Sequence, residues 1–138
     1  MLKDAKKLAD IIYAEAASEG IDTWHMIGST VLNRMSSLRT KEFGKDLDEV
    51  IKKGYWGKDS DLYKQAQDLR FPDNFSRKKY DAIYRVAEAM TEGKLKPKSG
   101  QFYFTPEEVA RLKEEGKFDF SQVRYLRPVG KYLVYTYW

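Results

Sequence analysis

The chain has 138 residues, of which 42% are hydrophobic, and it carries a net charge of +4. This length suits one domain with its own hydrophobic core, so we expect a single domain over residues 1–138. The chain has no cysteine, which excludes disulfides, thiol nucleophiles and thiolate metal sites. Its single histidine, His25, excludes a zinc site built on several imidazoles. We therefore expect neither a metal ion nor another cofactor.

Residues 1–16 lack the uninterrupted apolar segment and the small-residue cleavage site of a signal peptide. No stretch of the sequence is long and apolar enough to span a membrane. We expect a monomer without a signal peptide or a transmembrane segment. The positive charge favours polyanionic partners, among them nucleic acid and the anionic cell wall. The lysine and arginine residues are scattered along the chain, so charge alone does not identify the partner.

The first part of the chain shows helical periodicity. Residues 3–18 are expected to form a helix that stops at Gly20, and a second helix follows with Asp22 and Thr23 as candidate caps. Three further helices are predicted from capping residues at one end and apolar stripes or glycines at the other. They begin near Asp46, Ser60 and Ser76 and end near Gly54, Leu69 and Gly93.

The last third of the chain changes character. Gln101–Phe104 is expected to be a strand, and the run TPEE at residues 105–108 is typical of a helix start, here of a helix that ends at Gly116. Val123–Leu126 and Tyr132–Tyr137 are rich in aromatic and β-branched residues, which favours two more strands. The predicted fold class is α+β, with a helical body and a small antiparallel sheet near the C-terminus.

The first helix carries two carboxylates on its apolar face. At about 100° per residue, Glu15 and Glu19 lie about 20° on either side of Leu8, on the stripe that Ala5 and Ile12 also share. Burial of a carboxylate costs free energy unless the group is paired or protonated, so this placement requires a reason. The opposite face is expected to be solvated and holds Lys3, Lys6, Lys7 and Asp10.

The position of these carboxylates favours a chemical role. Both lie near the C-terminal end of the helix and beside apolar side chains, and each effect raises a carboxyl pKa. A carboxylic acid that stays protonated near neutral pH can donate a proton to a glycosidic oxygen. The structural alternative is an ion pair between Glu15 and a buried arginine such as Arg34, or a helix that ends before Glu19. The pattern supports both interpretations equally for Glu15 and favours the structural one for Glu19.

Two segments near the N-terminus resemble a known family. Residues 9–20, ADIIYAEAASEG, and residues 29–34, STVLNR, are similar to the opening of the spore-cortex-lytic (SleB-type) cell wall hydrolase family. Residues 99–104, SGQFYF, and residues 129–135, VGKYLVY, are similar to its later strands. The chain departs from the family at Ala17, Ser18 and Gly20, and it has Tyr132 where a histidine is frequent.

The resemblance implies a lysozyme-like fold with a carbohydrate cleft and with Glu15 as the catalytic acid. The implied reaction is cleavage of the β-1,4 bond between MurNAc and GlcNAc in peptidoglycan glycan strands, most often as a lytic transglycosylase, for which one carboxyl group suffices. A hydrolysing muramidase usually has a second carboxylate, for which Glu19 is the local candidate, on the same wall of the cleft. Such an enzyme acts at the bacterial cell wall, either released from the host cytoplasm in phage lysis, as an endolysin, or carried by a virion.

Sugar-binding clefts also need aromatic faces and hydrogen-bonding side chains. Trp56 is expected in a loop, where it either stacks on a sugar or anchors the loop. Gln101 and Tyr103 point to one face of their strand, which we assign to the cleft, while Phe102 and Phe104 point to the core. Tyr132 is the remaining candidate. Substrate binding is thus predicted for Glu19, Trp56, Gln101, Tyr103 and Tyr132.

Two other functions compete with glycan cleavage. A basic nucleic-acid-binding protein would also combine a positive charge with interleaved aromatic residues, but its cations are expected on one surface. No familiar nucleic-acid motif occurs in the chain, so no nucleic-acid partner is expected. The third possibility is a non-catalytic module that binds the cell wall.

Overall fold

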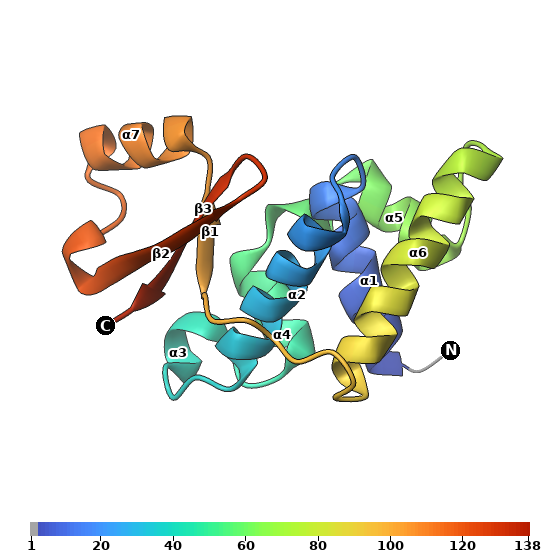
Figure 1. Ribbon diagram of the computed structural model, residues 1–138, viewed down its shortest axis with the longest axis horizontal. Coiled ribbons are helices and arrows are strands. Elements are labelled where there is room, and N and C mark those ends of the chain that lie inside the picture. The colour runs from blue at the N-terminus through green and yellow to red at the C-terminus, as the bar shows by residue number, and fades with distance from the viewer. Residues whose placement is uncertain (1–2) are drawn as a thin grey trace.

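The computed structural model describes residues 3–138, and within them it has an α+β fold with seven α-helices and a three-stranded antiparallel sheet near the C-terminus (Figure 1). The helices are α1 (Lys3–Ala16), α2 (Ile21–Met35), α3 (Thr40–Phe43), α4 (Leu47–Gly54), α5 (Asp61–Asp68), α6 (Asn74–Thr91) and α7 (Pro106–Glu115). Two short 3-10 helices are η1 (Trp56–Asp59) and η2 (Phe120–Gln122), and the strands are β1 (Phe102–Phe104), β2 (Val123–Val129) and β3 (Tyr132–Tyr137). None of the described helices has the length and apolar character needed to cross a membrane.

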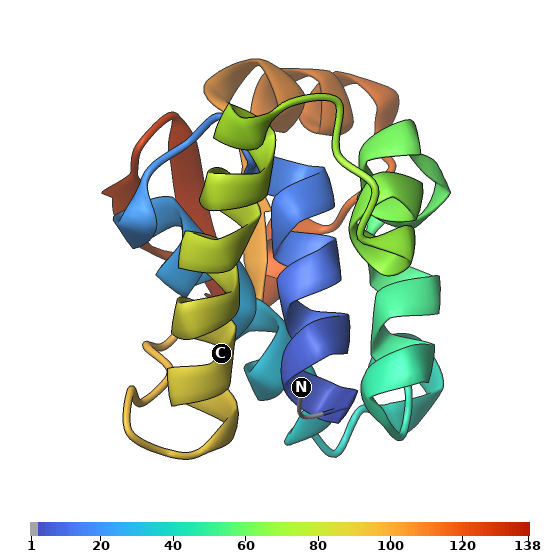
Figure 2. The ribbon, with the colours of Figure 1, turned by 90° about the vertical axis from the view of Figure 1, so that its right-hand side faces the viewer.

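Helix α1 lies at the centre of the helical body. Figure 2 shows it between α6 on one side and α4 and α5 on the other, while α2 packs against a further face. Leu8, Ile11 and Ile12 of α1 are fully buried, as are Ile27 of α2 and Ile83 of α6. Because helices cover α1 on several sides, the helix is buried over more of its circumference than a surface helix would be.

This packing corrects the expectation that Asp10 and Lys6 face solvent. Asp10 is only 4% exposed, and it accepts a hydrogen bond from the hydroxyl of Tyr80 at 2.6 Å. The Lys6 Nζ lies 3.0 Å from both carboxylate oxygens of Asp10 and donates to the Ala66 carbonyl at 2.9 Å. The part of this face that carries Lys6 and Asp10 is thus covered by α5 and α6, which contribute Ala66 and Tyr80, and the carboxylate is paired there.

Three helix boundaries differ from the predictions. Helix α1 ends at Ala16 rather than at residue 18, and the indole Nε1 of Trp24 donates a hydrogen bond of 2.8 Å to the Ala16 carbonyl. Helix α2 begins at Ile21 after Gly20, which provides no side-chain cap, so Asp22 and Thr23 lie in its first turn. Helix α6 begins earlier than expected, after Asp73, whose side chain caps the N–H of Ser76.

Capping residues in the sequence predicted the starts of α4, α5 and α7 correctly. Ser60 accepts a hydrogen bond from the N–H of Tyr63 at the start of α5, and Asp46 accepts one from Glu49 at the start of α4. Thr105 and Glu108 form the predicted capping box at the start of α7, with Pro106 at the first helical position. The structure confirms these predicted helix starts. They were predictable because the capping residue and the N–H that it binds lie within one helical turn of each other.

The sheet has the order β1-β3-β2, with β3 in the centre. Strand β2 extends to Val129, beyond the predicted end at Leu126, and includes Pro128. This is possible because β2 is an edge strand, where a missing backbone N–H removes no ladder hydrogen bond on the open side. An irregularity in the register between Tyr125 and Arg127 also falls in this strand.

The sheet is attached to the helical body through α2. Asn33 donates hydrogen bonds to the carbonyls of Lys98 and Gly100, and Arg34 Nε donates to the Gln101 carbonyl at 2.7 Å. Both side chains therefore hold residues 98–101 against α2. A second core of aromatic residues lies under the sheet and contains Phe43, Phe102, Phe104, Phe118, Phe120, Tyr135 and Tyr137.

Candidate active site

A cleft of about 450 Å³ lies between the helical body and the unit formed by the sheet and α7. The helical body contributes Glu15 from α1, Arg34 from α2, Gly54 from α4 and Trp56 from η1. The other side consists of Tyr103, Phe104, Glu108, Arg111, Leu112 and Tyr132. Residues far apart in the sequence thus meet around Glu15. Figure 1 shows the two sides of the molecule from which they come, the helical body with α1 and the unit of the sheet and α7.

Glu15 lies in the last turn of α1 and is partly buried. Its Oε1 accepts a hydrogen bond of 3.1 Å from the backbone N–H of Gly57. Burial raises the pKa of Glu15, and the charge of Glu108 acts in the same direction. The Gly57 hydrogen bond and the charges of Arg34 and Lys58 oppose this rise without cancelling it. The carboxyl group therefore keeps its proton to a higher pH than an exposed glutamate.

Arg34 is not the ion-pair partner that the structural alternative required. Among residues 3–138, no ion pair involves Glu15. The Arg34 guanidinium lies about 5 Å from three aromatic ring centroids and donates to backbone carbonyls instead. Its charge acts on Glu15 through the cleft, but Glu15 remains available to a ligand. The three rings belong to Phe43, Tyr55 and Phe102.

Three tyrosines lie beside Glu15. Tyr55 is buried beneath the cleft, and its hydroxyl is 2.8 Å from Thr30 Oγ1. The rings of Tyr103 and Tyr132 meet edge to face at 5.2 Å on the sheet side. Burial raises the pKa of Tyr103 well above its usual value, the charge of Glu15 adds to this, and burial also raises the pKa of Tyr132. Both cleft hydroxyls stay protonated and can donate hydrogen bonds.

Three of the predicted binding residues come together with Glu15. Tyr103 and Tyr132 line the cleft, and Trp56 stands at its edge with 91% of its surface exposed. Trp56 belongs to the short helix η1 rather than to an irregular loop. Phe104, which was assigned to the core, packs with the aromatic core and also reaches the cleft.

Gln101 does not line the cleft. Its Oε1 accepts hydrogen bonds of 3.0 Å from Thr136 Oγ1 and from the backbone N–H of Tyr137, at the far end of β3. Gln101 precedes β1 as a residue of the bend after Gly100, so the alternation expected for a continuous strand does not fix its direction. The structure gives it a role in holding the sheet together.

Glu19 is likewise separated from Glu15. Because α1 ends at Ala16, Glu19 lies in the turn before α2, and the helical spacing expected between the two carboxylates is absent. Its carboxylate pairs with Lys131 Nζ at 3.4 Å, in the turn between β2 and β3. Glu19 is not among the residues that line the cleft.

Sequence reasoning missed the contribution of α7. Glu108, Arg111 and Leu112 line the cleft, and their spacing of three and four residues places them on one face of the helix. This spacing is visible in the sequence directly after the strand that carries Tyr103. Only the fold, however, shows that this face of α7 turns towards Glu15.

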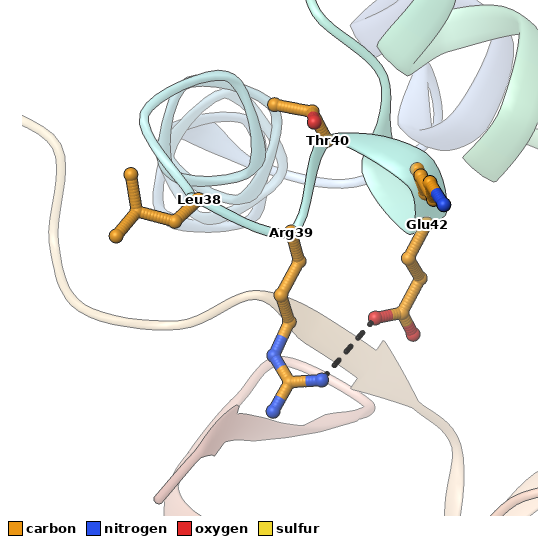
Figure 3. A pocket seen from close by; sticks show the side chains of 5 residues that line it. Leu38, Arg39, Thr40 and Glu42 are labelled. Atoms are coloured by element: carbon orange, nitrogen blue, oxygen red, sulfur yellow. Dashed lines mark ion pairs between the residues drawn. The ribbon is translucent and has the colours of Figure 1, made fainter.

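A second hollow, of about 430 Å³, lies beside α3 and is lined by residues 38–42 (Figure 3). Two of its charged side chains, Arg39 and Glu42, form an ion pair at 3.9 Å, and the Tyr137 hydroxyl also donates to Glu42. The Arg39 guanidinium stacks on the Tyr137 ring at 3.7 Å. These groups satisfy one another, so the hollow has no carboxyl group placed as Glu15 is.

The part of the chain that the structure describes contains no group of His, Cys, Asp and Glu side chains arranged to hold a metal ion. Comparison of the chain with known family models, curated proteins and solved structures gives no match.

Proposed function

We propose that this protein cleaves the β-1,4 bond between MurNAc and GlcNAc in bacterial peptidoglycan, with Glu15 as the general acid. The observation that carries the proposal is a partly buried carboxyl group with a raised pKa that faces an open cleft and has no ion-pair partner within residues 3–138. A carboxyl group in these surroundings is the usual proton donor to a glycosidic oxygen.

The proposal includes a lysozyme-like fold and membership of the SleB-type cell wall hydrolase family. The arrangement of a helical body and a small sheet on two sides of a cleft supports the first. The position of Glu15 in the motif-like segment at residues 9–20 supports the second, since the resemblance assigns the acid to this glutamate. Action at the bacterial cell wall, as part of phage lysis or wall penetration, belongs to the same proposal.

The chemistry begins with the protonated Glu15. Its proton passes to the glycosidic oxygen as the bond from that oxygen to C1 of MurNAc breaks, and positive charge develops on the sugar ring. The resulting Glu15 carboxylate keeps its hydrogen bond from the N–H of Gly57, which stabilises the negative charge. The oxygen that then attacks C1 comes either from the MurNAc 6-hydroxyl or from water.

Substrate binding is assigned to the aromatic groups of the cleft. The exposed indole of Trp56 offers a flat apolar face on which a sugar ring can stack. Tyr103 and Tyr132 offer protonated hydroxyl groups near Glu15. The net charge of +4 assists the approach to an anionic cell wall.

The proposal is tested with Glu15→Gln, which preserves the shape of the side chain and removes the acid. On purified sacculi, the rate of muropeptide release should fall by about 10²- to 10⁴-fold. Glu19→Gln is the matched control, since it changes a nearby carboxylate outside the cleft, and it should retain most of the activity. Release by Glu15→Gln at the wild-type rate would exclude this role. Wild-type protein that binds sacculi without releasing muropeptides would instead be a wall-binding module.

A further inference from the structure

The cleft contains a second carboxyl group, Glu108, on the wall that α7 forms. Glu15 comes from α1 in the helical body, whereas α7 lies beyond the sheet, and Figure 1 shows β1 between these two helices. Glu108 lies close enough to Glu15 for its charge to act on that group. The two carboxyl groups therefore face one cavity from different structural units, which is the arrangement that Glu19 does not provide.

The capping box holds Glu108 in place and leaves one of its oxygens available. Its Oε1 accepts a hydrogen bond of 3.0 Å from the backbone N–H of Thr105, and Thr105 Oγ1 accepts one from the Glu108 N–H at 3.2 Å. Within residues 3–138, Oε2 of Glu108 has no hydrogen-bond or ion-pair partner. A cap needs only the first oxygen, so the second can accept a proton from a ligand in the cleft.

The surroundings of the two carboxyl groups suit opposite roles. Glu108 lies in the first turn of α7, where its carboxylate accepts the hydrogen bond of the cap from the N–H of Thr105. Glu15 lies in the last turn of α1, where the dipole favours a neutral group, and it is partly buried. Two carboxyl groups held in unlike surroundings on one cleft form the arrangement that glycosidases use to divide acid and base functions.

We propose that Glu108 is the general base that activates a water molecule in the cleft, so that the protein hydrolyses the glycan to a reducing MurNAc end. The inference rests on the proposed function, because it requires a glycan whose leaving oxygen receives the proton of Glu15. It specifies the attacking group as water instead of the MurNAc 6-hydroxyl.

In this reaction the Glu15 proton passes to the oxygen that leaves with GlcNAc, and the bond from that oxygen to C1 breaks. The water oxygen forms a new bond to C1 while its proton passes to Oε2 of Glu108. The products are a hydroxyl group on GlcNAc and a hemiacetal at C1 of MurNAc. Glu108 is then protonated and Glu15 is ionised, and proton exchange with solvent restores the starting state.

The first test is the product of the wild-type protein, because it needs no variant. Purified peptidoglycan is digested and the muropeptides are analysed by mass spectrometry, in which a 1,6-anhydro end is lighter than a reducing end by one water molecule. We expect reducing MurNAc ends to predominate. If 1,6-anhydro ends predominate, the assignment of Glu108 is overturned while glycan cleavage by Glu15 stands. If no muropeptides are released, the proposed function itself fails.

The second test is Glu108→Gln, whose amide oxygen can still accept the hydrogen bond from Thr105 and preserve the cap. Formation of reducing ends should fall by about 10²- to 10⁴-fold, the range expected for loss of a general base. Glu107→Gln is the control, since Glu107 occupies the same turn, is exposed and does not line the cleft. A Glu108→Gln variant that is folded by circular dichroism and forms reducing ends at the wild-type rate would overturn the assignment. A lower rate together with a shift towards 1,6-anhydro ends supports it, because a merely structural role of Glu108 would not change the product.

Discussion

The backbone N–H of Gly57 donates a hydrogen bond of 3.1 Å to the carboxylate of Glu15, and so joins η1 to the last turn of α1. The close approach favours a residue without a side chain at this position. A Cβ atom at position 57 would lie 3.2 Å from Cδ of Glu15 and 3.0 Å from Cβ of Ala14. Gly57 therefore both orients the acid and leaves room for it.

Gly57→Val should reduce glycan cleavage by about 10²-fold, because displacement of a catalytic group by about 1 Å has an effect of this size. Overpacking against α1 should also lower the free energy of unfolding by about 1–3 kcal/mol. Gly57→Ala should have a smaller effect in the same direction, since it adds only a single methyl group beside Glu15 and Ala14. Muropeptide release and urea unfolding of both variants provide the measurement. Full activity in Gly57→Val would show that Glu15 does not depend on this contact.

Replacement of Glu15 should affect stability and activity in opposite directions. Burial raises the pKa of Glu15, so the native state favours the protonated form more than the unfolded chain does. The stabilisation that results is complete below the ordinary carboxyl pKa and is lost as the pH rises through the higher native pKa. Glu15→Gln stays neutral at every pH and does not show this loss.

The melting temperature of Glu15→Gln minus that of the wild type should therefore increase as the pH rises above the ordinary carboxyl pKa of about 4.5, and should become constant above the native pKa. Thermal melts over this range measure the difference, and Glu19→Gln serves as the comparison. A difference that decreases with increasing pH would mean that the native protein favours the ionised form of Glu15.

Trp56→Ala should impair substrate binding without affecting the fold. The side chain is 91% exposed, so its removal should change the free energy of unfolding by less than about 0.5 kcal/mol. Loss of one stacking contact should raise KM by about tenfold, with a smaller change in kcat. Trp138→Ala is the control, because Trp138 is 82% exposed and does not line the cleft. Equal effects of the two substitutions on KM would exclude a specific role for Trp56.

Features that depend on neighbouring residues could be predicted from the sequence. The capping box of Thr105 and Glu108 and the cap at Ser60 are formed within one helical turn, and both are present. The apolar face of α1 was also predicted correctly, and with it the orientation of Glu15 towards the protein. Each of these needs only helical geometry.

Features set by distant segments could not be predicted in this way. Helix α1 ends before Glu19, and the carbonyl of its last residue, Ala16, is bonded to the indole of Trp24 on α2. The direction of Gln101 depends on bonds to the end of β3. The most important omission, Glu108, has an evident local role as a cap, and its position in the cleft follows only from the packing of α7 across from α1.

The buried hydrogen-bond network of Asp10, Lys6 and Tyr80, on the other side of α1, allows a test of stability that does not involve the cleft. Asp10→Asn removes the negative charge of the carboxylate that pairs with Lys6 and accepts the hydrogen bond of the Tyr80 hydroxyl. The ammonium group of Lys6 would keep its hydrogen bond to the Ala66 carbonyl but would lose its counter-ion. The free energy of unfolding should therefore fall by about 1–3 kcal/mol. Asp48→Asn is the matched control. It breaks the ion pair, at 2.8 Å, between Asp48 of α4 and Lys7, which lies on α1 beside Lys6.

The Asp48 side chain is 70% exposed, so this second loss of stability should be clearly smaller than that caused by Asp10→Asn. Urea unfolding of the two variants gives the comparison, and muropeptide release by folded Asp10→Asn should remain close to that of the wild type because Asp10 does not line the cleft. Equal destabilisation by both substitutions would mean that burial adds nothing to the Asp10 network. Loss of activity in folded Asp10→Asn would instead connect this network to the position of Glu15, which lies on the same helix.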